Sequence, residues 1–215
     1  MKAALALLLA AASAVSAAPA APAAPAPDPT ALARKVQGYY ERTKDLQARF
    51  TQTYTYSGFG RRQASSGVLR VKKPGMMRWD YEKPAPKVVA VKGSRLVQHE
   101  PEENQAYVDE RFDASAMSAA VTFLLGKGDL VREFDLAVDG SGALLLTPKQ
   151  PDPRVQSIAL TVGRDGEVTA TRVVDGSGNV NELRFTDVKR NQGLKDAVFE
   201  VTLPKGVHLL AQPKR

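Results

Sequence analysis

The chain has 215 residues, a formal net charge of +7 at neutral pH and no cysteine. The lack of cysteine excludes disulfides, thiolate nucleophiles and thiolate metal sites. Basic residues are spread along the chain and form no concentrated stripe of the kind that a nucleic-acid-binding surface needs, so we expect no nucleic-acid partner. A basic surface of this kind suits anionic lipid head groups or an acidic protein partner.

The N-terminus predicts a cleaved export signal. Lys2 precedes an apolar run over residues 3–15, and Val15 and Ala17 occupy the small-residue positions before a cut after Ala17. The run is shorter than the roughly 20 apolar residues that cross a bilayer. We therefore predict a signal peptide at 1–17 and, because a cysteine-free export signal cannot lead to lipidation, a soluble periplasmic product.

An Ala/Pro-rich linker follows at 18–29, where an extended spacer is expected. The remaining residues, 30–215, are enough for one domain with its own core. A first helix is predicted over 30–43, with Asp28 or Thr30 as its cap. Its apolar positions recur at helical spacing: Leu32, Val36, Tyr39 and Tyr40.

The pattern then changes to a period of two, which is typical of a half-buried strand. Leu46, Ala48, Phe50, Tyr54 and Tyr56 fall on one side of this first strand. Further short strands, separated by Gly- and Pro-containing turns, are predicted around Leu69 and Val71, at 77–81, 87–91, 95–99 and 105–109.

A second helix is predicted from Asp113 to the glycines at 126 and 128, with Met117, Val121, Leu124 and Leu125 on one face. Strands resume after it, joined by turns rich in Gly and Asp, which is typical of an antiparallel meander. The predicted ranges are 130–138, 143–148, 154–162, 167–174, 180–188 and 197–203.

The predicted fold class is α+β: a strongly curled antiparallel sheet, an incomplete β-barrel of about 11 strands. Few open sheets carry so many strands without curling. The two helices are the only candidates to cover the concave apolar face. Adaptable Met and aromatic side chains on one face suit a variable apolar ligand. The proposed lipid-binding residues are Phe50, Tyr54, Leu69, Val71, Met77, Trp79, Tyr81, Met117, Val121 and Leu124.

Signals for catalysis are missing. His99 and His208 lie far apart in the sequence, and neither has metal-ligand spacing to another His, Asp or Glu. No nucleophile elbow, phosphate loop or dinucleotide fingerprint occurs. The cluster of Glu100, Glu102 and Glu103 fits a solvated loop better than an acid–base pair. We expect no enzyme activity, no catalytic residue, no metal and no cofactor.

Several motifs resemble one family. The segment from Leu69 to Trp79, LRVKKPGMMRW, is similar to the L-x-V-x-[RK]-P…W signature of the LolA outer-membrane lipoprotein carriers. Five other segments resemble further parts of the family pattern, in the same order over about residues 30–208: 50–52, 93–105, 146–149, 161–166 and 201–207.

This resemblance implies an incomplete β-barrel with a helical lid that shelters the acyl chains of lipoproteins. It implies an inner-membrane ABC transporter as donor and an outer-membrane lipoprotein receptor as acceptor, and we expect a monomer. Lys73 stands where the family has an Arg whose hydrogen bonds close the lid, so we predict that Lys73 is the latch, near the second helix. His99 or Glu100 stands where the family has a tyrosine.

Two other functions remain open. One is a periplasmic binding module or sensor for another lipid or hydrophobic ligand, which identification of co-purified cargo would reveal. The other is a lipid-modifying hydrolase, which an esterase screen would reveal.

Overall fold

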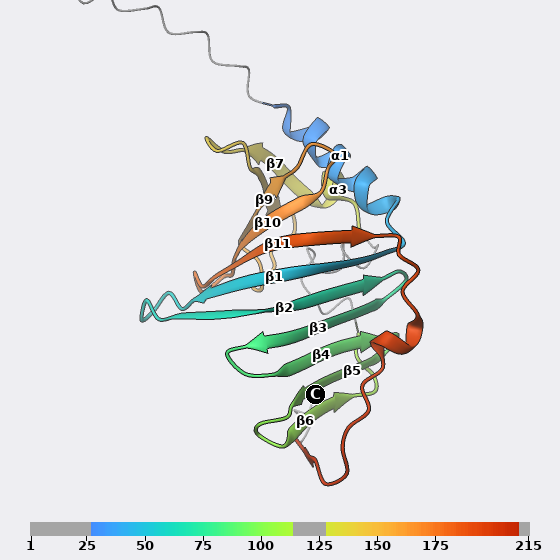
Figure 1. Cartoon of the computed structure of the whole chain (residues 1–215). Coiled ribbons are helices and arrows are strands. Elements are labelled where there is room, and N and C mark those ends of the chain that lie inside the picture. The colour runs from blue at the N-terminus through green and yellow to red at the C-terminus, as the bar shows by residue number, and fades with distance from the viewer. Residues whose placement is uncertain (1–26, 114–127, 211–215) are drawn as a thin grey trace, which may run out of the picture.

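The computed structural model describes residues 27–113 and 128–210 (Figure 1). The predicted signal peptide, most of the linker and the second predicted helix with Met117, Val121 and Leu124 lie outside these residues. In the described part of the chain, no helix is both long and apolar enough to span a membrane.

Helix α1 (Pro29–Glu41) confirms the first predicted helix and ends two residues earlier than expected. Asp28 caps it, because its carboxylate accepts hydrogen bonds from the backbone N–H groups of Thr30 and Ala31 at 3.1 and 3.2 Å. The helix lies beside the β7–β10 end of the sheet (Figure 1). It buries one face there, formed by Ala33, Val36, Tyr39 and Tyr40.

The sheet is open and almost entirely antiparallel, and the described residues contribute 12 strands to it in the order β12-β6-β5-β4-β3-β2-β1-β11-β10-β9-β8-β7. Pairing of β1 with β11 joins the N-terminal and C-terminal halves, and only β12 pairs in parallel, with β6. The predicted fold class is confirmed. The strands are β1 (Asp45–Thr55), β2 (Arg62–Lys72), β3 (Met76–Lys83), β4 (Lys87–Lys92), β5 (Arg95–Glu100), β6 (Gln105–Asp109), β7 (Phe134–Val138), β8 (Leu144–Pro148), β9 (Ser157–Val162), β10 (Val168–Val174), β11 (Val180–Arg190) and β12 (His208–Leu209).

One predicted strand was wrong in part and another was wrong throughout. The range 130–138 begins with a single helical turn, α3 (Leu130–Glu133), and only β7 is extended. Asp129 causes this, because its carboxylate accepts from the N–H groups of Val131 and Arg132 at 2.9 and 3.0 Å. The range 197–203 contains no strand; its start lies in a 3-10 helix, η2 (Asp196–Phe199).

The apolar core has two parts that meet at Phe185. The first lies between α1, α3 and the β8–β10 region, and the second surrounds Phe50, Leu69, Val71 and Met77. Beside the second part of the core, the backbones of β2 and β3 come close to each other. A Cβ at Gly67 would come within 1.9 Å of the Asp80 carbonyl oxygen, so only glycine fits there.

The segment after β11 crosses the face of β3 and β4 on which Arg78 lies, and this face points away from Trp79. The Arg78 guanidinium donates to the carbonyl oxygens of Val198 and Glu200 at 2.9 and 3.0 Å. Between these two carbonyls, the Phe199 side chain is only 2% exposed and packs near Ala90 and Val97. This segment therefore covers the outer face of β3 and β4, while the opposite face keeps the aromatic side chains.

Candidate functional site

A cavity of about 330 Å³ lies on the inner face of the sheet. Side chains from β8 to β11 form most of its wall, with Tyr40 of α1 and Leu130 of α3 at one end. The wall is mostly aliphatic, and six of its members are Leu146, Ile158, Leu160, Val168, Val173 and Leu183. Most binding cavities for small hydrophobic molecules have this composition, with a few polar groups at one side.

Aromatic side chains form the wall on the β1–β3 side. The Trp79 ring meets Phe50 edge-to-face with ring centroids 4.8 Å apart, and it stacks near Tyr81 at 6.3 Å. Phe185, which also lines the cavity, packs against the same group. Such edge-to-face pairs fix the ring positions. Trp79 therefore presents a rigid apolar surface to the space beside Phe185.

The other end of the cavity is polar. Tyr54, Asp175, Asn179 and Asn181 line it. The Asn179 amide donates to the Asp175 carboxylate at 2.9 Å, and this hydrogen bond is the main cause of the lowered pKa of Asp175. Burial, with Asp175 nearby, raises the pKa of Tyr54. The Tyr54 hydroxyl donates to the Asp175 carboxylate at 3.5 Å. The arrangement can hold an apolar chain with its polar end toward these groups.

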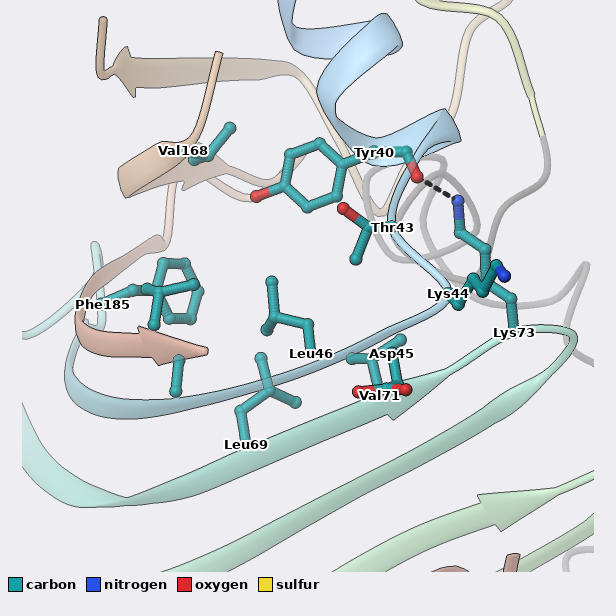
Figure 2. Close-up of a pocket in the computed structure, with 12 residues that line it drawn as sticks. Tyr40, Thr43, Lys44, Asp45, Leu46, Leu69, Val71, Lys73, Val168 and Phe185 are labelled. Carbon is teal, nitrogen blue, oxygen red and sulfur yellow. Dashed lines mark hydrogen bonds between the residues drawn. The ribbon is translucent and has the colours of Figure 1, made fainter. Parts of the chain in front are cut away.

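A smaller cavity of about 30 Å³ lies between the C-terminal end of α1 and strands β1 and β2 (Figure 2). Leu46, Leu69 and Val71 line its floor, and Lys73 lies at its edge. The Lys73 ammonium donates to the Tyr40 carbonyl oxygen at 2.5 Å. Burial lowers the pKa of Lys73, and the nearby Glu41 carboxylate acts in the opposite direction.

The predicted lipid-binding residues that lie in the described part of the chain fall into four groups. Tyr54 and Trp79 line the large cavity, Leu69 and Val71 line the small one, and Phe50 and Met77 are buried next to them. Tyr81 packs on Phe50 and lines a separate polar pocket of about 410 Å³. Lys73 contacts α1; its predicted contact with the second helix involves residues outside the described ones.

Sequence reasoning missed the larger wall, which comes from β8 to β11. A signal was present: Thr171 and Val173, and then Asn181, Leu183 and Phe185, alternate with exposed Arg172, Glu182 and Arg184. This alternation predicts which face is inward, but it does not distinguish the wall of a cavity from filled core. Within residues 27–113 and 128–210, no three His, Cys, Asp or Glu side chains lie close enough to hold a metal ion.

Known proteins resemble this chain in sequence and in fold. The family described as "Outer membrane lipoprotein carrier protein LolA" matches residues 41–202. An outer-membrane lipoprotein carrier protein of Dechloromonas aromatica is 29% identical over 182 residues, 83% of this chain and 86% of the relative. One from Pseudomonas paraeruginosa is 27% identical over 190 residues, 86% and 90% of the two chains. A solved structure of an uncharacterized conserved protein from Thermus thermophilus shares the fold, with a TM-score of 0.51, 12% identity and coverage of 84% and 97%.

Proposed function

Because the chain belongs to the LolA family of outer-membrane lipoprotein carrier proteins, we propose that it carries lipid-modified proteins across the periplasm with their acyl chains in the apolar cavity. The signal peptide is removed after Ala17, and the carrier is then soluble. The donor is an inner-membrane ABC transporter, and the acceptor is an outer-membrane lipoprotein receptor.

The observation that carries this proposal is the cavity of about 330 Å³ with its aliphatic and aromatic wall. Each buried methylene stabilises a complex by about 0.8 kcal/mol, so an acyl chain of a dozen carbons favours such a cavity over water by roughly 10 kcal/mol. That preference is large enough for a cover to be needed during transfer. It also means that release requires a partner with a comparable apolar site.

The geometry suggests how cargo sits in the cavity. Acyl chains extend along the wall of Trp79, Phe185 and Leu183, and the polar linkage to the protein lies toward Tyr54 and Asn179. Met77 and Phe50 support this wall from the side. Lys73 holds α1 beside the residue that follows β2, and loss of this contact would open the smaller cavity, which shares Tyr40, Val168 and Phe185 with the large one.

Photo-crosslinking at neighbouring positions of β3 tests the proposal. A photoreactive residue at Trp79 lies at the cavity, and one at Arg78 lies on the opposite face beside the segment after β11. In cells that make lipoproteins, we expect position 79 to capture them and position 78 not to do so. Equal capture at both positions, or capture at neither with cargo still released from the inner membrane, would overturn the proposal. A control with an unacylated cargo should abolish capture at position 79.

A further inference from the structure

The loop between β1 and β2 exposes an aromatic residue that the site does not use. Phe59 is 94% exposed, the highest value among the large hydrophobic residues of the described chain. Tyr56, at the start of the same loop, is 38% exposed. A phenyl ring in water is unfavourable, because burying such a side chain is worth about 1.5–3 kcal/mol. Contact with an apolar surface outside this chain would therefore stabilise the exposed ring of Phe59.

The loop that carries Phe59 has a defined conformation. The Tyr56 N–H donates to the Arg61 carbonyl and the Gly60 N–H donates to the Tyr56 carbonyl, both at 2.9 Å. Gly60 has a φ of +60°, which a residue with a side chain rarely adopts. The turn is therefore closed by its own backbone, and it presents Phe59 at the tip.

A second hairpin holds the base of this turn. The Ser57 hydroxyl donates to the Ser177 carbonyl oxygen at 2.7 Å, and the Ser57 N–H donates to the Asn179 side-chain oxygen at 3.1 Å. Asn179 also lines the polar end of the large cavity. The tip thus stands beside that end, and in Figure 1 the β1–β2 hairpin projects beyond the ends of the neighbouring strands.

Within residues 56–62 every charged side chain is positive; Asp175 lies in the second hairpin, at the base of the tip. Arg61 and Arg62 follow Phe59 after Gly60, both are exposed, and residues 56–62 contain no acidic side chain. Neither arginine forms a salt bridge with any residue in 27–113 or 128–210. The tip therefore combines one apolar ring with two cations that have no acidic partner in the described chain.

We propose that this tip, defined as residues 56–62, docks on a lipid surface that carries anionic head groups. Phe59 enters the head-group region, and Arg61 and Arg62 contact the anionic groups. A membrane fits better than a protein groove, because one ring with two flexible cations matches a soft charged surface. Each cation near such a surface adds about 1 kcal/mol, so the contact is weak, salt-dependent and reversible. It would bring the polar end of the cavity to the membrane where cargo is exchanged.

Vesicle binding by the purified chain without cargo tests this inference independently of the proposed function. The probes are vesicles of phosphatidylcholine alone and vesicles containing phosphatidylglycerol. We expect binding to the second kind only, with affinity reduced about tenfold by Phe59→Ser and by at least tenfold by the double change Arg61→Ser and Arg62→Ser. Leu209→Ser is the matched control, because Leu209 is 59% exposed at the far edge strand, and it should bind as the wild type does.

A Phe59→Trp variant measures directly how deeply residue 59 enters the lipid. Its fluorescence, after subtraction of the wild-type signal from Trp79, should shift to the blue and be quenched by brominated acyl chains on anionic vesicles. The inference is overturned if the wild type binds neither kind of vesicle, if Phe59→Ser binds as well as Leu209→Ser, or if the subtracted emission of Phe59→Trp does not change. Those results would leave cargo binding in the cavity untouched.

Discussion

The Lys73 ammonium and the Tyr40 carbonyl oxygen are 2.5 Å apart, which ties the residue after β2 to the last turn of α1 (Figure 2). The same carbonyl oxygen accepts a hydrogen bond from the Thr43 N–H at 3.0 Å. Carbonyl groups at a helix C-terminus lack intrahelical donors and carry partial negative charge, so a cation there is stabilising. Lys73 thereby joins helix and sheet at the smaller cavity.

Replacing Lys73 should loosen α1. We expect Lys73→Met to lower the free energy of unfolding by about 1–2 kcal/mol, because a hydrogen bond from a charged group is lost from a half-buried site. Amide hydrogen exchange at the C-terminal turn of α1 should accelerate, and an apolar fluorescent probe should enter faster. Lys73→Arg keeps the charge and should restore slow exchange. If Lys73→Met exchanges and takes up the probe at the wild-type rate, Lys73 does not hold the helix.

Stability should fall in alkali because of two adjacent tyrosines. Burial, helped by a hydrogen bond to Glu167, raises the pKa of Tyr39 to about 12, and burial also raises the pKa of Tyr40. The unfolded chain loses these protons near pH 10, whereas the folded chain retains them. Their contribution is therefore fully present below pH 10 and is lost as the pH rises toward 12.

The double variant Tyr39→Phe and Tyr40→Phe isolates this effect. Its unfolding free energy, from urea titrations at several pH values, should fall less steeply above pH 10 than that of the wild type. Lys73 has a lowered pKa and shifts stability in the opposite direction, but it is present in both proteins. If the unfolding free energies of the two proteins fall equally steeply with pH above 10, the tyrosine pKa values are not raised.

Phe199 should matter for stability and not for cargo. Its side chain is 2% exposed on the outer face, away from the cavity. Phe199→Ala should cost about 3–5 kcal/mol in unfolding free energy. Leu209→Ala, at an exposed position of the same C-terminal segment, should cost little. Uptake of an apolar probe at a temperature where the variant is folded should match the wild type; a large loss of uptake would mean that the outer face contributes to binding.

Local patterns predicted most of this fold. Alternation placed Phe50, Leu69 and Trp79 on one face, and the pairing of Leu69 with Trp79 across β2 and β3 confirms that placement. The range 197–203 was also predicted to be a strand, but no strand of the described chain pairs with this segment, and Phe199 is buried through the 3-10 turn instead. Tertiary packing decided that case, which a local pattern cannot show.

The site was harder to predict than the fold. Trp79 and Tyr54 were predicted from aromatic side chains at one strand parity, and both line the large cavity; their contact with lipid stays a prediction. Ile158 and Leu160 were missed as cavity residues, because an aliphatic residue in a strand has the same pattern whether the space before it is filled or empty. Only the pairing of β11 with β1, between residues more than a hundred positions apart, brings the two walls together.

Native mass spectrometry of the protein isolated from the periplasm tests the central claim most directly. Val173 lines the large cavity, and Val174, the next residue of β10, does not. Wild-type protein and Val174→Trp should carry the mass of an acylated lipoprotein. In Val173→Trp the new side chain should fill the cavity, and the fraction of protein that carries this mass should fall at least tenfold. Equal retention by the two tryptophan variants, or a bound species without an acyl chain, would contradict the account.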